Sequence, residues 1–273
     1  MSSAPAVASL RLGACRPQPR VSYALPRLAS ALASLLGQPV TAVQRDGYED
    51  LLDGFLAGEL DVAWLPPLLH ARASARGGQA LAVPIRAGSL TYRSALLVAP
   101  GAACSDVHEL HGVRAAWVDR FSASGYHFPR LELERCGVLL ADALRTEVFH
   151  GSTVRAASAV AAGEADLCAC FVTDSAGRDR FHAQADLGRA LGPLAERLRI
   201  LHVTGPIPPD GLLAGKHVER ALAQRVADAL LALHESAEGA EVLRGLIQAD
   251  RLVAPTEAVM RSLEVWSGPP VVS

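Results

Sequence analysis

The chain has 273 residues, of which 50% are hydrophobic and 20% charged, and its formal net charge is −2. This length and apolar content suffice for one large domain or for two lobes with their own cores. The near-neutral charge without basic runs disfavours nucleic-acid binding and a polybasic membrane surface. No apolar run approaches the roughly 18 residues needed to cross a bilayer. The sequence therefore predicts a globular protein that neither binds nucleic acid nor inserts into a membrane.

Strand-like and helix-like segments alternate along the chain, which is typical of an α/β fold. In the first part we expect strands at residues 10–14, 39–45, 60–66, 80–86 and 92–100, with helices at 23–37, 48–58 and after 66. Further strands are expected at residues 113–119, 144–150, 165–172 and 198–205. Apolar residues at three- and four-residue spacing predict helical structure from about 216 to 251.

Two segments of the chain follow the same plan. Residues 47–65 and 151–171 each begin with Gly and a polar residue, continue as a helix, turn at Gly-Glu-x-Asp and end in an apolar strand. Shared βαβ construction alone can produce such similarity. The alternative is a pair of similar lobes, each directing a helix N-terminus toward a common cleft.

The stretch DRFSASGYHFPRLELERCG, from Asp119 to Gly137, follows a predicted strand. Ser122, Ser124 and Gly125 precede a helical pattern that begins near Phe128. Serine is a strong N-cap, and the first amides of a helix have no partner within the helix. Serine hydroxyls beside such amides can hold a phosphate-like oxyanion. Simple capping of the helix explains the same residues, so both interpretations stay open at this point.

The segment FHGST, at residues 149–153, repeats the arrangement. A strand ends, Ser152 and Thr153 form a turn, and a helix begins. Tyr48 opens a helix and Tyr92 lies at the edge of a strand, where a tyrosine can line a pocket and donate a hydrogen bond to an oxyanion. Each of these residues can equally serve a purely structural purpose.

The five cysteines, at positions 15, 104, 136, 168 and 170, have no disulfide-framework spacing, which favours a reducing compartment. Cys168 and Cys170 are two apart on a predicted strand and therefore share a face. They can pack as small apolar residues or offer two thiolates to a metal, and the lack of an obvious third soft ligand favours packing. We predict no metal site.

No nucleophile elbow, dinucleotide glycine fingerprint, Walker loop or HExxH helix is present. The sequence therefore predicts no catalytic residue and no cofactor. The N-terminus has no basic region, and Arg11 interrupts what would be the apolar part of a signal peptide. We expect a cytoplasmic location, or a periplasmic one if the N-terminus was trimmed.

The chain resembles the phosphate/phosphonate-binding proteins of ABC transporters, from about Leu10 to Arg251. The densest match is YRSALLVAPGAACSDVHELHGVRAAWVDRFSASGYHFPRLELERCG, at residues 92–137. There the family pattern is a Tyr-Arg-Ser strand, a Leu-x-Gly turn, a second strand and Ser-Thr-Ser-Gly-Tyr-x-x-Pro. HGSTVRAASAVAAGEADLC resembles the family's Gly-Ser-His helix and Gly-Glu-x-Asp strand, and TGPIPPDGLLA its return segment.

The resemblance implies a two-lobed type 2 periplasmic-binding-protein fold with a central cleft and two crossover strands. One lobe would hold residues 1–95 and 201–273, and the other residues 96–200. The resemblance places the anionic head of a ligand at the helix start after Ser122, Ala123 and Ser124. It also implies that Tyr48, Tyr92, Ser152 and Thr153 line the cleft.

Three departures from the family pattern predict a less cationic site. Ala123 replaces a threonine, Thr153 replaces a histidine, and Cys168, Cys170 and Phe171 occupy the strand where the family often has a polar or acidic residue. A dianionic phosphonate would lose about 1–3 kcal/mol for each missing charge-assisted bond. A smaller or less charged oxyanion, a carboxylate or a partly apolar molecule is therefore the alternative ligand.

Three functions follow as hypotheses. The first is a solute-binding protein for a small anionic or polar ligand, with an ABC transporter permease as partner. The second is a cytosolic enzyme of the same fold acting on a small carboxylate metabolite, for which a buried acid or base such as Asp174 or His150 would be the distinguishing feature. The third is a ligand sensor that signals to a regulatory protein.

Overall fold

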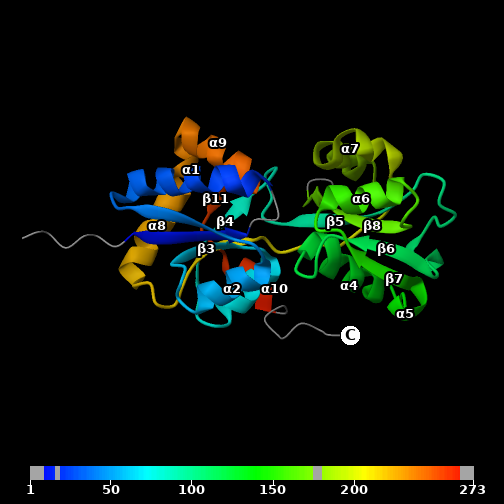
Figure 1. The fold of residues 1–273 in the computed structure, drawn as a ribbon, viewed down its shortest axis with the longest axis horizontal. Coiled ribbons are helices and arrows are strands. Elements are labelled where there is room, and N and C mark those ends of the chain that lie inside the picture. Colours follow the sequence, from blue (N-terminus) through cyan, green and yellow to red (C-terminus); the bar gives the residue numbers. More distant parts are fainter. Residues whose placement is uncertain (1–8, 16–18, 175–179, 265–273) are drawn as a thin grey trace, which may run out of the picture. The chain divides into compact units, whose positions relative to one another are not determined.

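A computed structural model of the chain describes residues 9–15, 19–174 and 180–264. The chain forms two compact units, each with a sheet and helices of its own (Figure 1). The first unit contains Met1–Arg86 and Pro209–Ser273, and the second contains Ala87–Pro208. The chain therefore passes from one unit to the other twice.

The first sheet has six strands. In spatial order they are β11 (Arg251–Val253), β4 (Gln79–Ile85), β10 (Gly211–Ala214), β3 (Val62–Leu65), β1 (Leu10–Cys15) and β2 (Val40–Arg45). Strand β1 pairs in parallel with β2 and β3, whereas β10 is antiparallel to β3 and β4. All four residues of β10 are buried. Such a short, fully buried strand has no polar alternation, which is why the sequence pattern did not predict it.

Helices cover both faces of the first sheet (Figure 1). On one face lie α1 (Pro19–Leu36), α8 (Arg220–Ala232) and α9 (Ala237–Ile247), whose apolar residues pack with those of β1 and β4 into one core. The remaining helices are α2 (Tyr48–Leu56), α3 (Pro67–Ser74), η5 (Leu233–Glu235) and α10 (Glu257–Glu264). The helical segment expected at 216–251 is thus divided, because η5 and the capping Ser236 separate α8 from α9.

The second sheet has five strands. In spatial order they are β7 (Leu144–Phe149), β6 (Val113–Trp117), β8 (Leu167–Thr173), β5 (Tyr92–Val98) and β9 (Arg199–Val203). Strand β6 pairs in parallel with β7 and β8, and β5 is antiparallel to β8 and β9. The lobe boundaries expected at 95/96 and 200/201 fall inside β5 and β9, whereas the compact units divide at 86/87 and 208/209.

The second sheet also lies between two helical layers (Figure 1). Helices α6 (Thr153–Ala161) and α7 (Arg180–Leu191) pack on one face, in a core that includes Cys168 and Cys170. Helices α4 (Phe128–Arg135) and α5 (Leu140–Ala143) lie on the other, over a core around Trp117. The shorter elements are η1 (Val107–Glu109), η2 (Ala123–His127) and η4 (Gly192–Arg197). Among the described residues, no helix combines the length and apolarity needed to cross a membrane.

The two similar sequence segments form matching structures in the two units. Arg11 of β1 donates from its backbone amide and its guanidinium to Asp61 at 2.7–2.9 Å, and to the Gly58 carbonyl at 2.8 Å. Arg114 of β6 makes the same contacts with Asp166 at 2.8–3.0 Å and with the Gly163 carbonyl at 2.9 Å. In both units the Gly-Glu-x-Asp turn is therefore anchored by one arginine to a neighbouring parallel strand, β1 in the first unit and β6 in the second. The sheets match as well, since β2-β1-β3-β10 and β7-β6-β8-β5 have the same strand directions.

Candidate functional site

One edge of the second sheet gathers most of the residues that the sequence predicted to contact a ligand. Because β6, β7 and β8 are parallel, their carboxyl ends lie at the same edge. Strand β5 is antiparallel to β8, and its first residue, Tyr92, pairs with the last residue of β8, Thr173. The starts of η2 and α6, the end of β8 and Tyr92 therefore meet at this edge. Ligands of open α/β sheets bind at such strand ends.

Backbone hydrogen bonds hold the first two of these segments together. The His150 amide donates to the Trp117 carbonyl at 2.9 Å, and the Gly151 amide donates to the Val118 carbonyl at 2.8 Å. The turns after β6 and β7 are consequently fixed beside each other. The two helix starts, which the sequence predicted separately, belong to one surface of the second unit.

Ser122 caps a short π-helical turn, η2, that directly precedes α4. Its side chain accepts a hydrogen bond from the Gly125 amide at 3.1 Å, and residues 123–127 form a π-helical turn that leads into α4. The α-helix α4 begins at Phe128, as the sequence predicted, and the π-helical turn before it was not expected. The sequence indicated the cap residue correctly, but the π-helical turn depends on tertiary contacts. Such turns are frequent at functional sites.

The turn that leads into η2 is held by Asp119. Its carboxylate accepts a hydrogen bond from the Phe121 amide at 2.7 Å, and its carbonyl accepts one from the Ser122 amide at 3.2 Å. Burial raises the pKa of Asp119, although bonds from these amides oppose the rise. The backbone at the start of η2 is thus fixed before any ligand arrives.

The amides of Ala123 and Ser124 are the free donors of this helix start. At the start of a helix, the first amides have no carbonyl of the same helix to which they can donate. Among the described residues, neither amide donates a hydrogen bond to any other group. The side chain of Ala123 is only 5% exposed, so its methyl group points into the protein. Ser124 is half-buried, and its hydroxyl makes no hydrogen bond within the described part of the chain. Two amides and one hydroxyl are therefore available.

Ser94 fixes the position of this donor group. It is fully buried on β5, and its hydroxyl donates to the Ser124 carbonyl at 2.6 Å. The Ser94 amide in turn donates to the Thr204 hydroxyl at 3.0 Å. In the sequence, Tyr-Arg-Ser is only a motif shared with the family. The structure gives its serine a specific role, which is to hold the peptide carbonyl of Ser124.

The turn at Gly125 leaves no space for a side chain. A Cβ atom there would lie 2.3 Å from Val118 Cγ2 and 2.7 Å from Ser122 Oγ. We expect Gly125→Ala to lower the free energy of unfolding by about 1–3 kcal/mol, since overpacking forces the backbone to shift. Urea denaturation measures this change. Gly188→Ala on α7 is the matched control, because a Cβ there meets nothing within 4 Å; an equal loss in both variants would contradict the steric explanation.

The start of α6 supplies the second donor group. Ser152 caps the helix by accepting a hydrogen bond from the Arg155 amide at 3.3 Å, so its hydroxyl serves the helix. Thr153 is the first residue of α6, is half-buried, and has a hydroxyl that bonds to no described residue. The structure thus divides the predicted residues into caps, Ser122 and Ser152, and residues with available donors, Ser124 and Thr153.

The two tyrosines lie in different units. Tyr92 begins β5 in the second unit, is half-buried, and exchanges backbone hydrogen bonds with Ile207 at 2.7 and 3.3 Å. Tyr48 is the first residue of α2 in the first unit, where it occupies the position that Thr153 occupies in α6. Both are half-buried. Their contact with a ligand remains a prediction.

Sequence reasoning named Asp174 only as a possible acid or base, and the structure gives it a different role. Its carboxylate accepts hydrogen bonds from Thr91 Oγ1 at 2.5 Å, Arg93 Nε at 2.5 Å and Ser89 Oγ at 3.3 Å. Burial acts to raise its pKa, but the bonds from Thr91 and Arg93 outweigh burial and lower it. Asp174 is therefore ionised and paired, and it neutralises Arg93 at this edge.

Cys168 and Cys170 share one face of β8, as predicted, and both are fully buried in the core beneath α6 and α7. Burial raises the pKa of the Cys168 thiol and raises that of Cys170 to about 12. Both thiols are consequently protonated. They fill the core as small apolar groups, which matches the packing interpretation.

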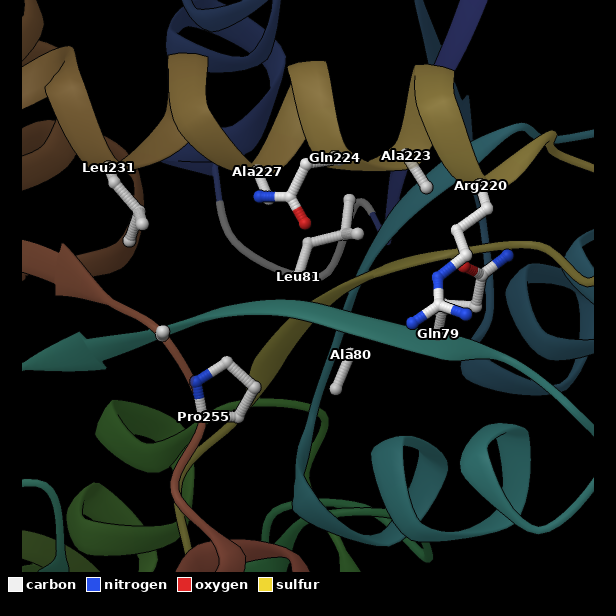
Figure 2. A pocket seen from close by; sticks show the side chains of 10 residues that line it. Gln79, Ala80, Leu81, Arg220, Ala223, Gln224, Ala227, Leu231 and Pro255 are labelled. Carbon is white, nitrogen blue, oxygen red and sulfur yellow. The ribbon is translucent and has the colours of Figure 1, made fainter.

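A separate hollow of about 210 Å³ lies in the first unit, between α8 and β4 (Figure 2). Its lining mixes apolar side chains, Leu81 and Ala223 among them, with polar ones, and Arg220 is the cation on its wall. No residue that the sequence predicted to contact a ligand lines it. We therefore place the candidate site at the edge of the second sheet.

The chain belongs to the family described as the periplasmic substrate-binding protein of the phosphonate ABC transporter, whose pattern matches residues 16–259. This match confirms the resemblance found in the sequence. The class is that of substrate-binding proteins for small ligands, with a transporter permease as partner. The family match does not support a regulatory partner. It does not support a cytoplasmic location either, because the family is described as periplasmic.

Solved structures with the same fold confirm the α/β, two-lobed class. XAC2383 from Xanthomonas citri, solved bound to ATP, is 19% identical, covers 95% of each chain and gives a TM-score of 0.80. PhnD1 from Prochlorococcus marinus, in complex with methylphosphonate, is 16% identical over 94% of this chain and 96% of its own, with a TM-score of 0.76. A binding protein component of the ABC phosphonate transporter from Pseudomonas aeruginosa is 18% identical over 95% and 86%, with a TM-score of 0.76.

Proposed function

We propose that the chain is a solute-binding protein that holds the oxyanion head of a small ligand at the edge of the second sheet. The observation that carries the proposal is the start of η2, where the amides of Ala123 and Ser124 have no acceptor and the Ser124 hydroxyl lies beside them. The Thr153 hydroxyl at the start of α6 adds a further donor. Helix N-termini favour anions through their free amides and dipole.

The charged side chains at this edge indicate that uncharged donors would bind the oxyanion. Arg93 is paired with Asp174, and Thr153 occupies the position where the family has histidine. An oxyanion would therefore be bound by amides and hydroxyls rather than by cations. The family description and the ATP- and methylphosphonate-bound structures of similar fold support a phosphoryl or phosphonyl group as the head. With fewer cationic donors, we expect a less charged head, such as a phosphodiester or a phosphonate monoanion, to be preferred over a dianion.

Isothermal titration calorimetry tests this proposal directly. We expect binding of a phosphodiester or of methylphosphonate as its monoanion, weaker binding of inorganic phosphate as the dianion, and still weaker binding of small carboxylates. Raising the salt concentration should have a small effect, since few cations are involved. Heat signals indistinguishable from buffer for every one of these anions would refute the oxyanion proposal.

Single hydroxyl deletions locate the site. Ser124→Ala and Thr153→Val should each weaken binding of the best of these ligands about fivefold, which corresponds to about 1 kcal/mol for one hydrogen bond. Ser158→Ala is the matched control, because Ser158 is exposed in the middle of α6. Unchanged affinity in the first two variants would remove these residues from the site.

The family's transporter role leads us to propose a permease as the protein partner and the periplasm as the compartment. A pull-down with an ABC-transporter permease of the native host, in the presence and absence of ligand, tests the first. Fractionation of the native host tests the second. Recovery of the chain with cytoplasmic markers alone would contradict the periplasmic assignment.

A further inference from the structure

Three side chains with different ligand atoms lie together beneath the second sheet, on the face covered by α4. Glu132 and Cys136 are one helical turn apart at the end of α4, and His202 projects from β9. One ligand atom from each, namely a carboxylate oxygen, a sulfur and a ring nitrogen, lies within 4.8 Å of the other two. Among the described residues, Glu132, Cys136 and His202 form a group of potential metal ligands.

The separations suit a tetrahedral ion. Glu132 Oε1 and His202 Nε2 are 3.2 Å apart, close to the about 3.3 Å between two ligands of a tetrahedral zinc with bonds of about 2.0–2.1 Å. Three atoms no more than 4.8 Å apart share a point within about 2.8 Å of each, and shifts of about 0.5–0.8 Å reach zinc bond lengths. Side-chain rotation alone provides such a shift.

The donor types select among metals. Calcium and magnesium bind through oxygen ligands, so a site with one sulfur and one imidazole nitrogen disfavours them. Zinc accepts thiolate, imidazole and carboxylate together, and three protein ligands leave a fourth position for water. The carboxylate and the thiolate would also balance the two positive charges of the ion.

Burial and the surrounding contacts support the same conclusion. Glu132 is only 5% exposed, and buried carboxylates are normally paired or bound to metals. The Gly205 amide donates to its Oε2 at 3.3 Å, which orients the carboxylate and leaves Oε1 directed at His202. Arg135 lies 3.8 Å from Oε2 and its side chain is 65% exposed, so solvent weakens its charge. Such secondary contacts are typical around metal ligands.

We propose that Glu132, Cys136 and His202 bind a single zinc ion with water as the fourth ligand. This site is separate from the ligand-binding edge and does not depend on the proposed solute. The ion would link the end of α4 to β9. Because α4 continues directly from η2, zinc would also stabilise the element that carries the Ala123 and Ser124 amides. The site escaped the sequence pattern because Glu132 and His202 are far apart in the chain.

Cobalt serves as a spectroscopic probe of the site in the full-length protein, after removal of metals with a chelator and with the thiols kept reduced. We expect one equivalent of Co²⁺ to produce a thiolate charge-transfer band in the near ultraviolet and the visible bands of tetrahedral cobalt. One equivalent of Zn²⁺ should abolish both. Absence of the thiolate band, or saturation well below one equivalent, would overturn the proposal.

Variants assign the ligands. Cys136→Ser should remove the charge-transfer band, and both Cys136→Ser and His202→Gln should weaken Zn²⁺ binding at least tenfold in competition with a chromophoric chelator. Cys104→Ser is the matched control, since Cys104 is likewise partly exposed, and should leave the spectrum unchanged. Melting in excess chelator checks that each variant folds. Wild-type affinity in Cys136→Ser, or the loss of the band in Cys104→Ser, would exclude this assignment.

Discussion

Replacing Asp210 with asparagine is expected to lower the free energy of unfolding of the first unit by about 3 kcal/mol or more. Asp210 is 6% exposed and binds Arg86 through two hydrogen bonds, at 2.6 and 2.9 Å. It also accepts a hydrogen bond from the Trp64 indole. Burial acts to raise the pKa of Asp210, but the charge of Arg86 and these hydrogen bonds outweigh it and lower the pKa. The carboxylate is thus ionised and its removal leaves a largely buried arginine without its counter-charge.

The loss can be localised by hydrogen exchange. Arg86 also donates to the Ile247 carbonyl at 2.9 Å, so the variant should weaken the contacts among β4, β10 and α9. Amide exchange followed by mass spectrometry should show faster exchange in peptides of the first unit and unchanged exchange in those of the second. Asp228→Asn, at an exposed position of α8, is the control and should be neutral. A variant as stable as this control would show that the ion pair contributes little.

Lowering the pH from 7 to 4 is expected to remove about 3 kcal/mol of stability through His70 alone. This histidine of α3 is fully buried, and a Cβ on Gly211 would lie 2.6 Å from its Cε1, so packing around the ring is tight. Burial lowers the pKa of His70 to about 4, although the Pro209 carbonyl and the charge of Asp210 favour the protonated ring. The unfolded chain takes up the proton near the ordinary value of about 6.5.

The sign of the effect follows from proton binding. Between pH 6.5 and pH 4 the unfolded chain binds the proton and the folded chain does not, so acid favours unfolding in this window. Above pH 6.5 the contribution is constant. Urea denaturation of the wild type and of His70→Leu across pH 4–7 isolates the contribution of His70 to the free energy of unfolding. The other titrating groups are common to both proteins. Parallel pH profiles for the two proteins would rule out a depressed pKa at His70.

Local patterns in the sequence predicted most of the architecture. The parallel strands β1, β2, β3, β6, β7 and β8 were each expected, and β3 and β8 are the most continuously apolar of them. The matching Gly-Glu-x-Asp turns were visible as a repeated motif. Their partners, Arg11 and Arg114, were not, since each lies about 50 residues upstream and has no local signal. Strand β10 was missed for a related reason, because its burial comes from neighbours on both sides.

The candidate site was predictable in outline and not in detail. Capping preferences identified Ser122 and Ser152, and the order of strands and helices placed them at strand ends. The π-helical turn, by contrast, depends on Gly125 lying against Val118, which is a contact in space. The buried hydroxyl of Ser94 and the pairing of Asp174 with Arg93 are also contacts between distant segments. Residue type alone gives no information on such pairs.

The position of the donors at strand ends has a consequence for how this protein can change. Thr153 and Ser124 follow the strands and have hydroxyls that take no part in the hydrogen bonds of the core, whereas Ser94, Ser122 and Gly125 maintain the framework behind them. If the proposed site holds the ligand, substitutions at the first pair would alter the preferred solute one residue at a time while the sheet remains intact. In the proposed site, the residues that would select the ligand are therefore different from those that maintain the fold.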